Sequence, residues 1–272
     1  MISRNSILFL GVGNMGAAIL GGVLKSGVFS ARQILLSDPF EEKCAPFVEC
    51  GCRYFPSPAE AVVAADCVLL AVKPQQIDAV MAEIAPYVND KLVISIAAGV
   101  PIQRIANALP GASVVRVMPN TPLLVGEGVS ALCRDVAVSP VTEEDFELAF
   151  RIFSASGIAA EMPESLINPV TALTSSSIAY FARFIGDMYD WAIANGFAPG
   201  DETLSLICHS AIGSASLLLN TDHSPASLEK AVTSPGGTTE QAMKVFTEKN
   251  LHEAVSAAMD ACRRRADELA GN

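Results

Sequence analysis

The sequence predicts an α/β fold in the first part of the chain and an all-α fold in the second. Short apolar runs alternate with helical segments as far as residue 162, which is typical of a parallel sheet with helices on both faces. Beyond Met162-Pro163 the strand signals vanish, and apolar residues recur at helical spacing. We therefore expect two domains, residues 1–162 and residues 163–272.

The strands expected in the first domain are nearly continuous runs of apolar residues, as strands buried on both faces should be. They cover Ile7–Leu10, Ile34–Leu36, Cys67–Val72, Leu92–Ile96 and Val114–Met118, with shorter strands near Val129–Cys133 and Ile158–Ala160. The helices expected between them cover Asn14–Ser26, Glu41–Cys50, Pro58–Ala65, Gln75–Ala85 and Pro101–Leu109.

The second domain should contain helices alone, covering Ser165–Asn195, Asp201–Asn220, Pro225–Val232, Thr239–Thr247 and Leu251–Ala270. The segment Asp201–Asn220 is apolar nearly all round, which is typical of a buried helix. A helical domain of this size has too little interior for so many apolar side chains. We therefore expect it to form a homodimer, because one patch can then cover its own copy.

The composition disfavours several classes of function. The net charge of −11 leaves no basic patch for a nucleic-acid partner. The 7 cysteines and 3 histidines show no spacing typical of a metal site, so no metal is expected. We see no signal peptide, and no window reaches the length of a membrane span without charge, glycine or proline. We expect a cytoplasmic protein with no membrane partner.

A Gly-x-Gly-x-x-Gly pattern follows the first strand and opens the first helix, which is typical of a Rossmann-like dinucleotide-binding domain. The first glycine permits a tight turn, the second lets the backbone approach a pyrophosphate, and the third allows close helix–strand packing. The helix N-terminus favours the negative charge. The alternative is a glycine-rich helix start without a ligand. The cofactor-binding candidates here are Gly11, Gly13, Asn14, Met15 and Gly16.

Asp38 ends the second strand, about 20 residues after Gly16, where a carboxylate can accept hydrogen bonds from the adenosine ribose. It would repel a 2′-phosphate, and Lys43 is the only cation nearby. We therefore expect NADH or NADPH as cofactor, with NADH serving at least as well. Asp38 could instead cap the next helix, and the two roles are compatible.

Further cofactor candidates lie at the carboxyl ends of the next three strands, the edge where ligands sit in open α/β folds. Pro74 stops one strand so that Lys73 can project toward the cofactor, although a solvent-facing lysine is the alternative. Small residues and prolines at the two later strand ends suit a close floor for a nicotinamide ring. The candidates are Ala71, Val72, Lys73, Pro74, Ala97, Ala98, Gly99, Asn120 and Thr121.

A glycine-rich loop in the second domain, Ser234-Pro235-Gly236-Gly237-Thr238-Thr239, lies just before a helix. Successive backbone N–H groups at such a helix start form an anion-binding concavity, and a carboxylate is a natural guest. The threonine hydroxyls lie where they could reach a group beside that carboxylate. A simple turn before a capped helix is the alternative interpretation.

The whole chain resembles the pyrroline-5-carboxylate reductase family, because five motifs occur in family order: Gly11–Gly16, Ala71–Pro74, Ser95–Val100, Met118–Pro122 and Ser234–Thr239. The resemblance implies reduction of 1-pyrroline-5-carboxylate to L-proline by hydride transfer from NAD(P)H, in proline biosynthesis. It also implies that Ser234, Gly236, Gly237, Thr238 and Thr239 bind the substrate. Thr239, the catalytic candidate, would hydrogen-bond the imine nitrogen. Family members often assemble five dimers, which predicts a decamer.

One departure keeps two alternatives open. Similar family members carry glycine and proline where this chain has Ser175 and Ile178, in the run Thr174–Tyr180. The chain could therefore be a non-catalytic NAD(P)-binding paralogue. A β-hydroxyacid dehydrogenase-like enzyme would share the first motif but needs a catalytic lysine, and Lys230, Lys244 and Lys249 match no such setting.

Overall fold

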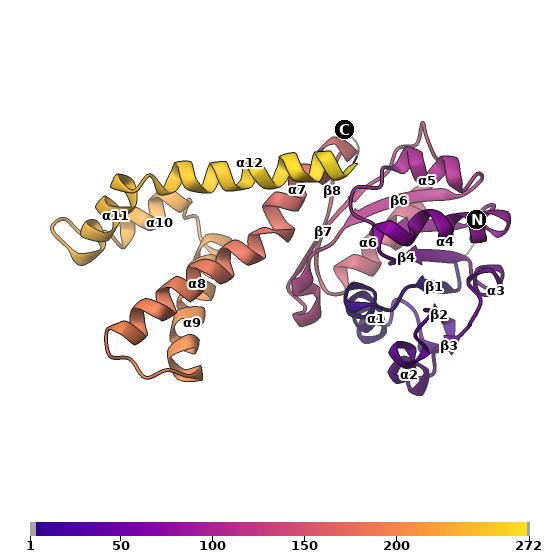
Figure 1. Ribbon diagram of the computed structural model, residues 1–272, viewed down its shortest axis with the longest axis horizontal. Coiled ribbons are helices and arrows are strands. Elements are labelled where there is room, and N and C mark those ends of the chain that lie inside the picture. The colour runs from indigo at the N-terminus through magenta and orange to yellow at the C-terminus, as the bar shows by residue number, and fades with distance from the viewer. Residues whose placement is uncertain (1–3, 271–272) are drawn as a thin grey trace. The chain divides into compact units, whose positions relative to one another are not determined.

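A computed structural model describes residues 4–270 and has the predicted α/β architecture followed by helices (Figure 1). The strands are β1 Ile7–Leu10, β2 Ile34–Ser37, β3 Arg53–Tyr54, β4 Cys67–Leu70, β5 Leu92–Ser95, β6 Ser113–Met118, β7 Gly128–Cys133 and β8 Gly157–Glu161. The helices of this part are α1 Asn14–Ser26, α2 Glu41–Glu49, α3 Pro58–Val63, α4 Ile77–Ile84, α5 Ile102–Ala108, α6 Glu143–Ser154 and α7 Ile167–Val170. Short 3₁₀ segments are η1 Ala31–Gln33, η2 Pro74–Gln76, η3 Ala85–Tyr87, η4 Thr121–Val125 and η5 Glu164–Leu166.

The 8 strands form one sheet in the order β3-β2-β1-β4-β5-β6-β7-β8. All neighbours pair in parallel except β6 and β7, which are antiparallel. Strands on both sides of β1 and β4 therefore place their carboxyl ends at one edge, which is where an open α/β sheet binds its ligand.

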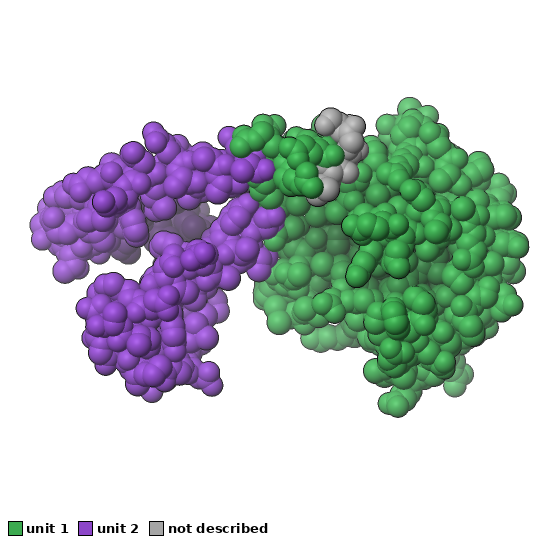
Figure 2. Space-filling model, viewed as in Figure 1, with its two compact units in different colours: residues 1–175, 262–272 green, residues 176–261 purple. Residues whose placement is uncertain are grey.

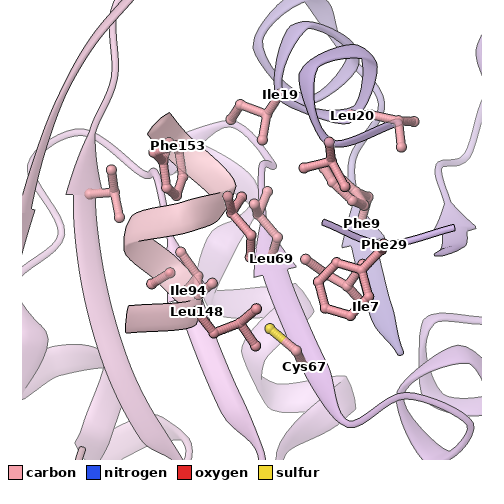
Figure 3. Close-up of a cluster of buried hydrophobic side chains, with 14 of the residues drawn as sticks. Ile7, Phe9, Ile19, Leu20, Phe29, Cys67, Leu69, Ile94, Leu148 and Phe153 are labelled. Atoms are coloured by element: carbon pink, nitrogen blue, oxygen red, sulfur yellow. The ribbon is translucent and has the colours of Figure 1, made fainter. Parts of the chain in front are cut away.

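The sheet is buried on both faces because alternate side chains of each strand enter different hydrophobic clusters. Ile7 and Phe9 of β1 belong to one cluster, whereas Leu8 and Leu10 belong to the other. In the first cluster, residues of α1 and α6 lie around β1, β4 and β5 (Figure 3). This period of two explains why the strands read as continuous apolar runs.

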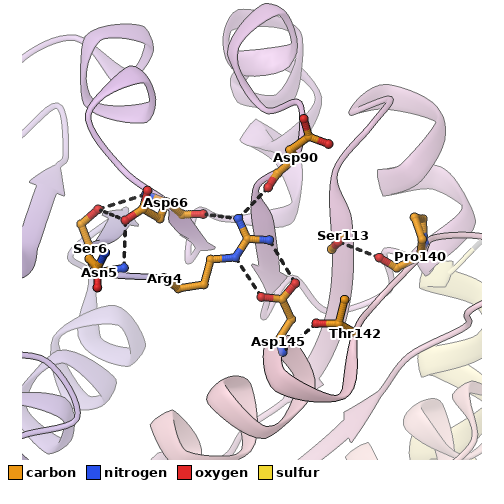
Figure 4. A network of polar contacts seen from close by, with 9 residues as sticks. All are labelled: Arg4, Asn5, Ser6, Asp66, Asp90, Ser113, Pro140, Thr142 and Asp145. Atoms are coloured by element: carbon orange, nitrogen blue, oxygen red, sulfur yellow. Dashed lines mark hydrogen bonds and ion pairs between the residues drawn. The ribbon is translucent and has the colours of Figure 1, made fainter. Parts of the chain in front are cut away.

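Arg4 joins the loops that precede β4 and β5 to the first turn of α6, at the amino-terminal ends of the parallel strands (Figure 4). Its guanidinium donates to both carboxylate oxygens of Asp145, at 2.8 and 3.0 Å, and to the backbone oxygens of Asp66 and Asp90. Thr142 caps α6 by accepting the N–H of Asp145, so the partner carboxylate is itself held in place. The pair lies opposite the ligand-binding edge and stabilises the sheet.

The chain forms two compact units, residues 1–175 with 262–272 and residues 176–261 (Figure 2). The second unit contains α8 Ser177–Ala194, α9 Asp201–Asn220, α10 Pro225–Ala231, α11 Thr238–Glu248 and the first half of α12 Leu251–Ala270, as far as Ala261. Among the described residues, Thr203 is the one buried residue of α9, the single helix that is long and apolar enough to cross a membrane by length and composition. The second unit thus leaves large apolar side chains exposed, including Phe181, Trp191 and Leu219.

The long helix expected over Ser165–Asn195 is not continuous, and this expectation was wrong. Between α7 and α8 the backbone forms a π-helical turn, η6 Thr171–Ser175. The Thr174 carbonyl accepts a hydrogen bond from the Asn120 side chain at 2.9 Å, and the Thr174 hydroxyl donates back to the Val170 carbonyl. Bonds of this kind compete with the regular helical ladder and widen the turn.

Candidate active site

The glycine-rich loop is shaped by the lack of side chains at two positions. Gly11 has a φ of +96°, and a Cβ there would lie 2.8 Å from the Ala71 carbonyl oxygen of the neighbouring strand end. A Cβ on Gly16 would lie 2.3 Å from the Gly11 oxygen, so only glycine lets α1 pack this closely. Gly13 differs, because nothing lies within 4 Å of its Cβ position. Its backbone is open to an approaching ligand.

A cavity of about 780 Å³ lies beside this loop at the carboxyl ends of β1, β4, β5 and β6. It brings together most of the cofactor candidates: Gly13, Asn14, Met15, Ala71, Val72, Lys73, Pro74, Ala97 and Ala98. Val12, Ile96, Met118 and Pro119 also line it; they lie within the predicted motifs but were not named as candidates. Ala17 lines it too and lies outside those motifs. The glycine loop and the strand-end motifs therefore share one site.

A second cavity of about 250 Å³ shares Gly13, Lys43 and Lys73 with the first and extends to Asp38. Asp38 is 7% exposed, and both of its carboxylate oxygens accept backbone N–H groups. Oδ2 accepts from Val12 at 2.8 Å and Oδ1 from Phe40 at 2.9 Å. The carboxylate is thus fixed beside the glycine loop.

Lys43 is the cation closest to this carboxylate, with Nζ 3.7 Å from Asp38 Oδ1. The same ammonium lies 4.2 Å from the centre of the Phe40 ring. Burial, and then the Asp38 carboxylate, raise the pKa of the neighbouring Cys44 thiol to about 11. Cys44 is therefore a neutral core residue at physiological pH.

The remaining cofactor candidates lie at the margin of the cavities. Gly99 lines a neighbouring cavity of about 310 Å³, and Thr121 is exposed. Asn120 is buried, and its side-chain amide joins two segments: Oδ1 accepts the N–H of Val129 at 2.8 Å, and Nδ2 donates to the Thr174 carbonyl. Its cofactor role stays a prediction, because the amide supports the loop of the cavity floor in this structure.

Two residues that the sequence did not reveal tie the cavity floor to the segment that follows β8. Glu164 Oε1 accepts the backbone N–H of Ile102 at 2.8 Å, just after the Ala97–Gly99 loop. The same oxygen accepts from buried Arg116 of β6 at 2.9 Å. A lone arginine inside an apolar strand was the available signal, because a buried charge needs a partner.

Ser175, where the family resemblance led us to expect glycine, lies against the same floor. Its hydroxyl donates to the Pro119 carbonyl at 3.4 Å. Its side chain therefore makes a contact within the first unit, at the end of the π-helical turn.

The predicted substrate loop lies in the second unit. The Gly237 N–H donates to the Ser234 carbonyl at 2.9 Å, and Gly236 at the third position has a φ of +73°, as in a type II turn with proline second. Gly237 then caps α11 without a side chain. Thr238 and Thr239 begin the helix, so the loop has the geometry of an anion-binding helix start.

Comparison with known proteins identifies the family. Residues 164–269 match the family model described as pyrroline-5-carboxylate reductase dimerisation, and residues 6–99 match one described as NADP oxidoreductase, coenzyme F420-dependent. The chain is 37% identical over 269 residues to pyrroline-5-carboxylate reductase of Escherichia coli K12, covering 98% of both chains. It is 39% identical over 274 residues to that of Pseudomonas aeruginosa, covering 99% of this chain and 98% of the relative.

Solved structures agree with the sequence relatives. A pyrroline-5-carboxylate reductase from Coxiella burnetii has a TM-score of 0.90 at 33% identity, covering 98% of this chain and 99% of that one. The Plasmodium falciparum enzyme, solved with NADP bound, has a TM-score of 0.89 at 26% identity and covers 98% and 100%. The motifs, the dinucleotide-type cavity and these full-length matches lead to one conclusion: the chain belongs to the pyrroline-5-carboxylate reductase family.

Proposed function

We propose that the protein reduces 1-pyrroline-5-carboxylate to L-proline with NADH or NADPH, as an enzyme of proline biosynthesis. The observation that carries this proposal is the cavity of about 780 Å³, in which the glycine-rich loop meets the carboxyl ends of four strands. The curated relatives bear the name of this activity over nearly the full length of the chain.

The residues present fit a dinucleotide. The open Cβ position of Gly13 and the uncapped start of α1 leave room for a pyrophosphate against backbone N–H groups. Asp38 would accept the ribose hydroxyls, and Ala97 and Ala98 would form the floor under the nicotinamide. When bound, the cofactor supplies the hydride.

The cavity is suited to positioning catalysis. Among the described residues that line it, Lys43 and Lys73 are the titratable ones, so it presents no acid–base dyad. Imine reduction needs little such machinery, because a ring imine is readily protonated and its carbon is then electrophilic. The main task of the protein is to hold the two reacting carbons together.

The loop Ser234–Thr239 would hold the substrate. Ser234, Gly236, Gly237 and Thr238 would surround its carboxylate, and the Thr239 hydroxyl would hydrogen-bond the ring nitrogen. The helix start without a side-chain cap supports this assignment, because the first backbone N–H groups of a helix favour an anion.

We also infer that the helical part forms a homodimer, with residues 163–272 as the dimerisation and substrate-binding domain. A groove of about 640 Å³ in the second unit is lined by large apolar side chains, among them Phe184, Trp191 and Leu206. A second copy would bury these residues in a large hydrophobic interface. Five such dimers would form the decamer that the family resemblance predicts. Sedimentation at micromolar concentration tests the dimer, which a stable, active monomer would contradict.

The net charge of −11 disfavours a nucleic-acid partner, and we infer a cytoplasmic protein without a membrane partner. The decisive experiment for the reaction is oxidation of NADH and NADPH with 1-pyrroline-5-carboxylate, with proline identified as the product. A β-hydroxyacid such as 3-hydroxyisobutyrate with NAD⁺ serves as the control for the alternative reaction. Cofactor binding without turnover would instead identify a non-catalytic paralogue.

A further inference from the structure

The loop that would receive the substrate carboxylate already holds a carboxylate of the protein itself. Glu240 lies in the first turn of α11, and its Oε2 accepts the backbone N–H of Gly236 at 3.1 Å. The same Oε2 accepts a hydrogen bond from Lys244 Nζ at 3.3 Å, one helical turn further on. Glu240 is therefore shared between the loop and a lysine.

Local sequence explains this contact. Glu240 is the third residue of α11, and a glutamate at that position can reach back to a backbone N–H ahead of the helix. The positive end of the helix dipole favours the negative charge. The type II turn at Gly236 brings the acceptor and donor together without burying the side chain, which remains partly exposed.

We propose that Glu240 determines the affinity for substrate by competing with the substrate carboxylate for the loop Ser234–Thr239. The inference rests on the proposed function, in which this loop binds the carboxylate of 1-pyrroline-5-carboxylate. One N–H cannot serve two carboxylates equally, and two like charges at one site repel each other. Substrate must therefore displace Oε2 from Gly236.

Lys244 provides the place to which the displaced carboxylate moves. A glutamate and a lysine four residues apart face each other on a helix, and here the ion pair already exists. Glu240 can thus leave Gly236 while keeping a charged partner. L-Proline carries the same carboxylate as the substrate, so the competition also weakens product binding and speeds its release.

The test compares Glu240→Gln and Glu240→Ala with wild type and with Glu248→Gln. Glu248 ends the same helix, so its variant removes an equal charge far from the loop. We would measure kcat and KM for 1-pyrroline-5-carboxylate, the inhibition constant of L-proline, the KM of the cofactor, and the melting temperature. The carboxylate-free analogue 1-pyrroline is the second substrate.

We expect both Glu240 variants to lower the KM for 1-pyrroline-5-carboxylate and the inhibition constant of proline, by about two- to tenfold, the range of one net hydrogen bond. The KM for 1-pyrroline, the KM of the cofactor and the Glu248→Gln parameters should stay at wild-type values. A residue that merely stabilised the helix would not improve substrate affinity when removed.

An unchanged or raised KM in the Glu240 variants overturns the inference, as does an equal fall for 1-pyrroline. Failure of the proposed function gives a different result, because wild-type protein would then not reduce 1-pyrroline-5-carboxylate at all. If Glu240→Gln keeps the Gly236 contact through its amide oxygen, Glu240→Ala removes that acceptor and decides the matter.

Discussion

Cofactor choice should depend on the charge of Asp38, which the structure fixes beside the glycine-rich loop. Both carboxylate oxygens are held by backbone N–H groups, of Val12 and Phe40, and the side chain is 7% exposed. It cannot turn away from a 2′-phosphate without losing both bonds. Asp38→Asn removes the charge and keeps the shape of the side chain.

The size of the effect follows from the charges. Two unit charges about 4 Å apart repel each other by about 1 kcal/mol in bulk water and by about 4 kcal/mol at the effective dielectric of a protein surface. Lys43, with Nζ 3.7 Å from Asp38, offsets part of this repulsion. We therefore expect Asp38→Asn to shift the specificity toward NADPH by about 1–2 kcal/mol, which is about 5- to 30-fold.

The assay is the ratio of kcat/KM for NADH to kcat/KM for NADPH, at fixed ionic strength because salt screens the interaction. Glu41→Gln is the matched control, since Glu41 lies at the start of α2 but does not line the cavity. Wild type should use NADH at least as well as NADPH. A strong wild-type preference for NADPH, or a ratio that Asp38→Asn leaves unchanged, would refute the reasoning.

Three further results are expected. Thr239→Ala should lower kcat/KM by about 10- to 100-fold, since it would remove a hydrogen bond to a charged group worth about 1.5–3 kcal/mol. The cofactor Kd should stay constant, and Thr239→Ser should restore turnover. Wild-type kcat/KM in the alanine variant would disprove the role proposed for the Thr239 hydroxyl. Asp145→Asn should lower the free energy of unfolding by about 3 kcal/mol, because it leaves the buried Arg4 charge without its carboxylate partner. Urea unfolding of the variant and of wild type measures this, and an unchanged urea midpoint would contradict it. Iodoacetamide at pH 8 should label exposed Cys50 in the native protein but not buried Cys133. Burial raises the pKa of the Cys133 thiol to about 12, so the thiol is neutral and unreactive at pH 8. Mass spectrometry of native and urea-unfolded samples checks this, and rapid labelling of Cys133 in the native protein would contradict it.

The sequence predicted the elements whose signal is local. Helix α1 begins and ends at the predicted residues, Asn14 and Ser26, because a glycine motif precedes it and Gly27 follows in the left-handed region. The dinucleotide motifs likewise met in one cavity, since parallel strands bring their carboxyl ends to one edge. Periodicity and glycine positions were sufficient for these features.

Features that depend on distant contacts were missed. At the break, Thr171–Ser175, the Asn120 side chain donates a hydrogen bond to the Thr174 carbonyl, from a loop about 50 residues earlier in the chain. Helix α6, by contrast, was not predicted although its signal is local, since Thr142 caps it and acidic residues fill its first turn. The Glu240–Gly236 contact could be suspected from a glutamate at the third helical position.

The course of α12 has a consequence for the synthesis of the protein. Its last residues, from 262 onward, belong to the first compact unit, and Asp267 accepts a hydrogen bond from Asn168 at 3.1 Å across 99 residues of chain. The dinucleotide-binding unit is therefore discontinuous in sequence, with the helical unit inserted before its end. A nascent chain on the ribosome can form the sheet early, yet this unit lacks its second segment until the residues from Cys262 onward have been synthesised. Chains truncated before Cys262 would leave the ribosome without the segment that completes this unit.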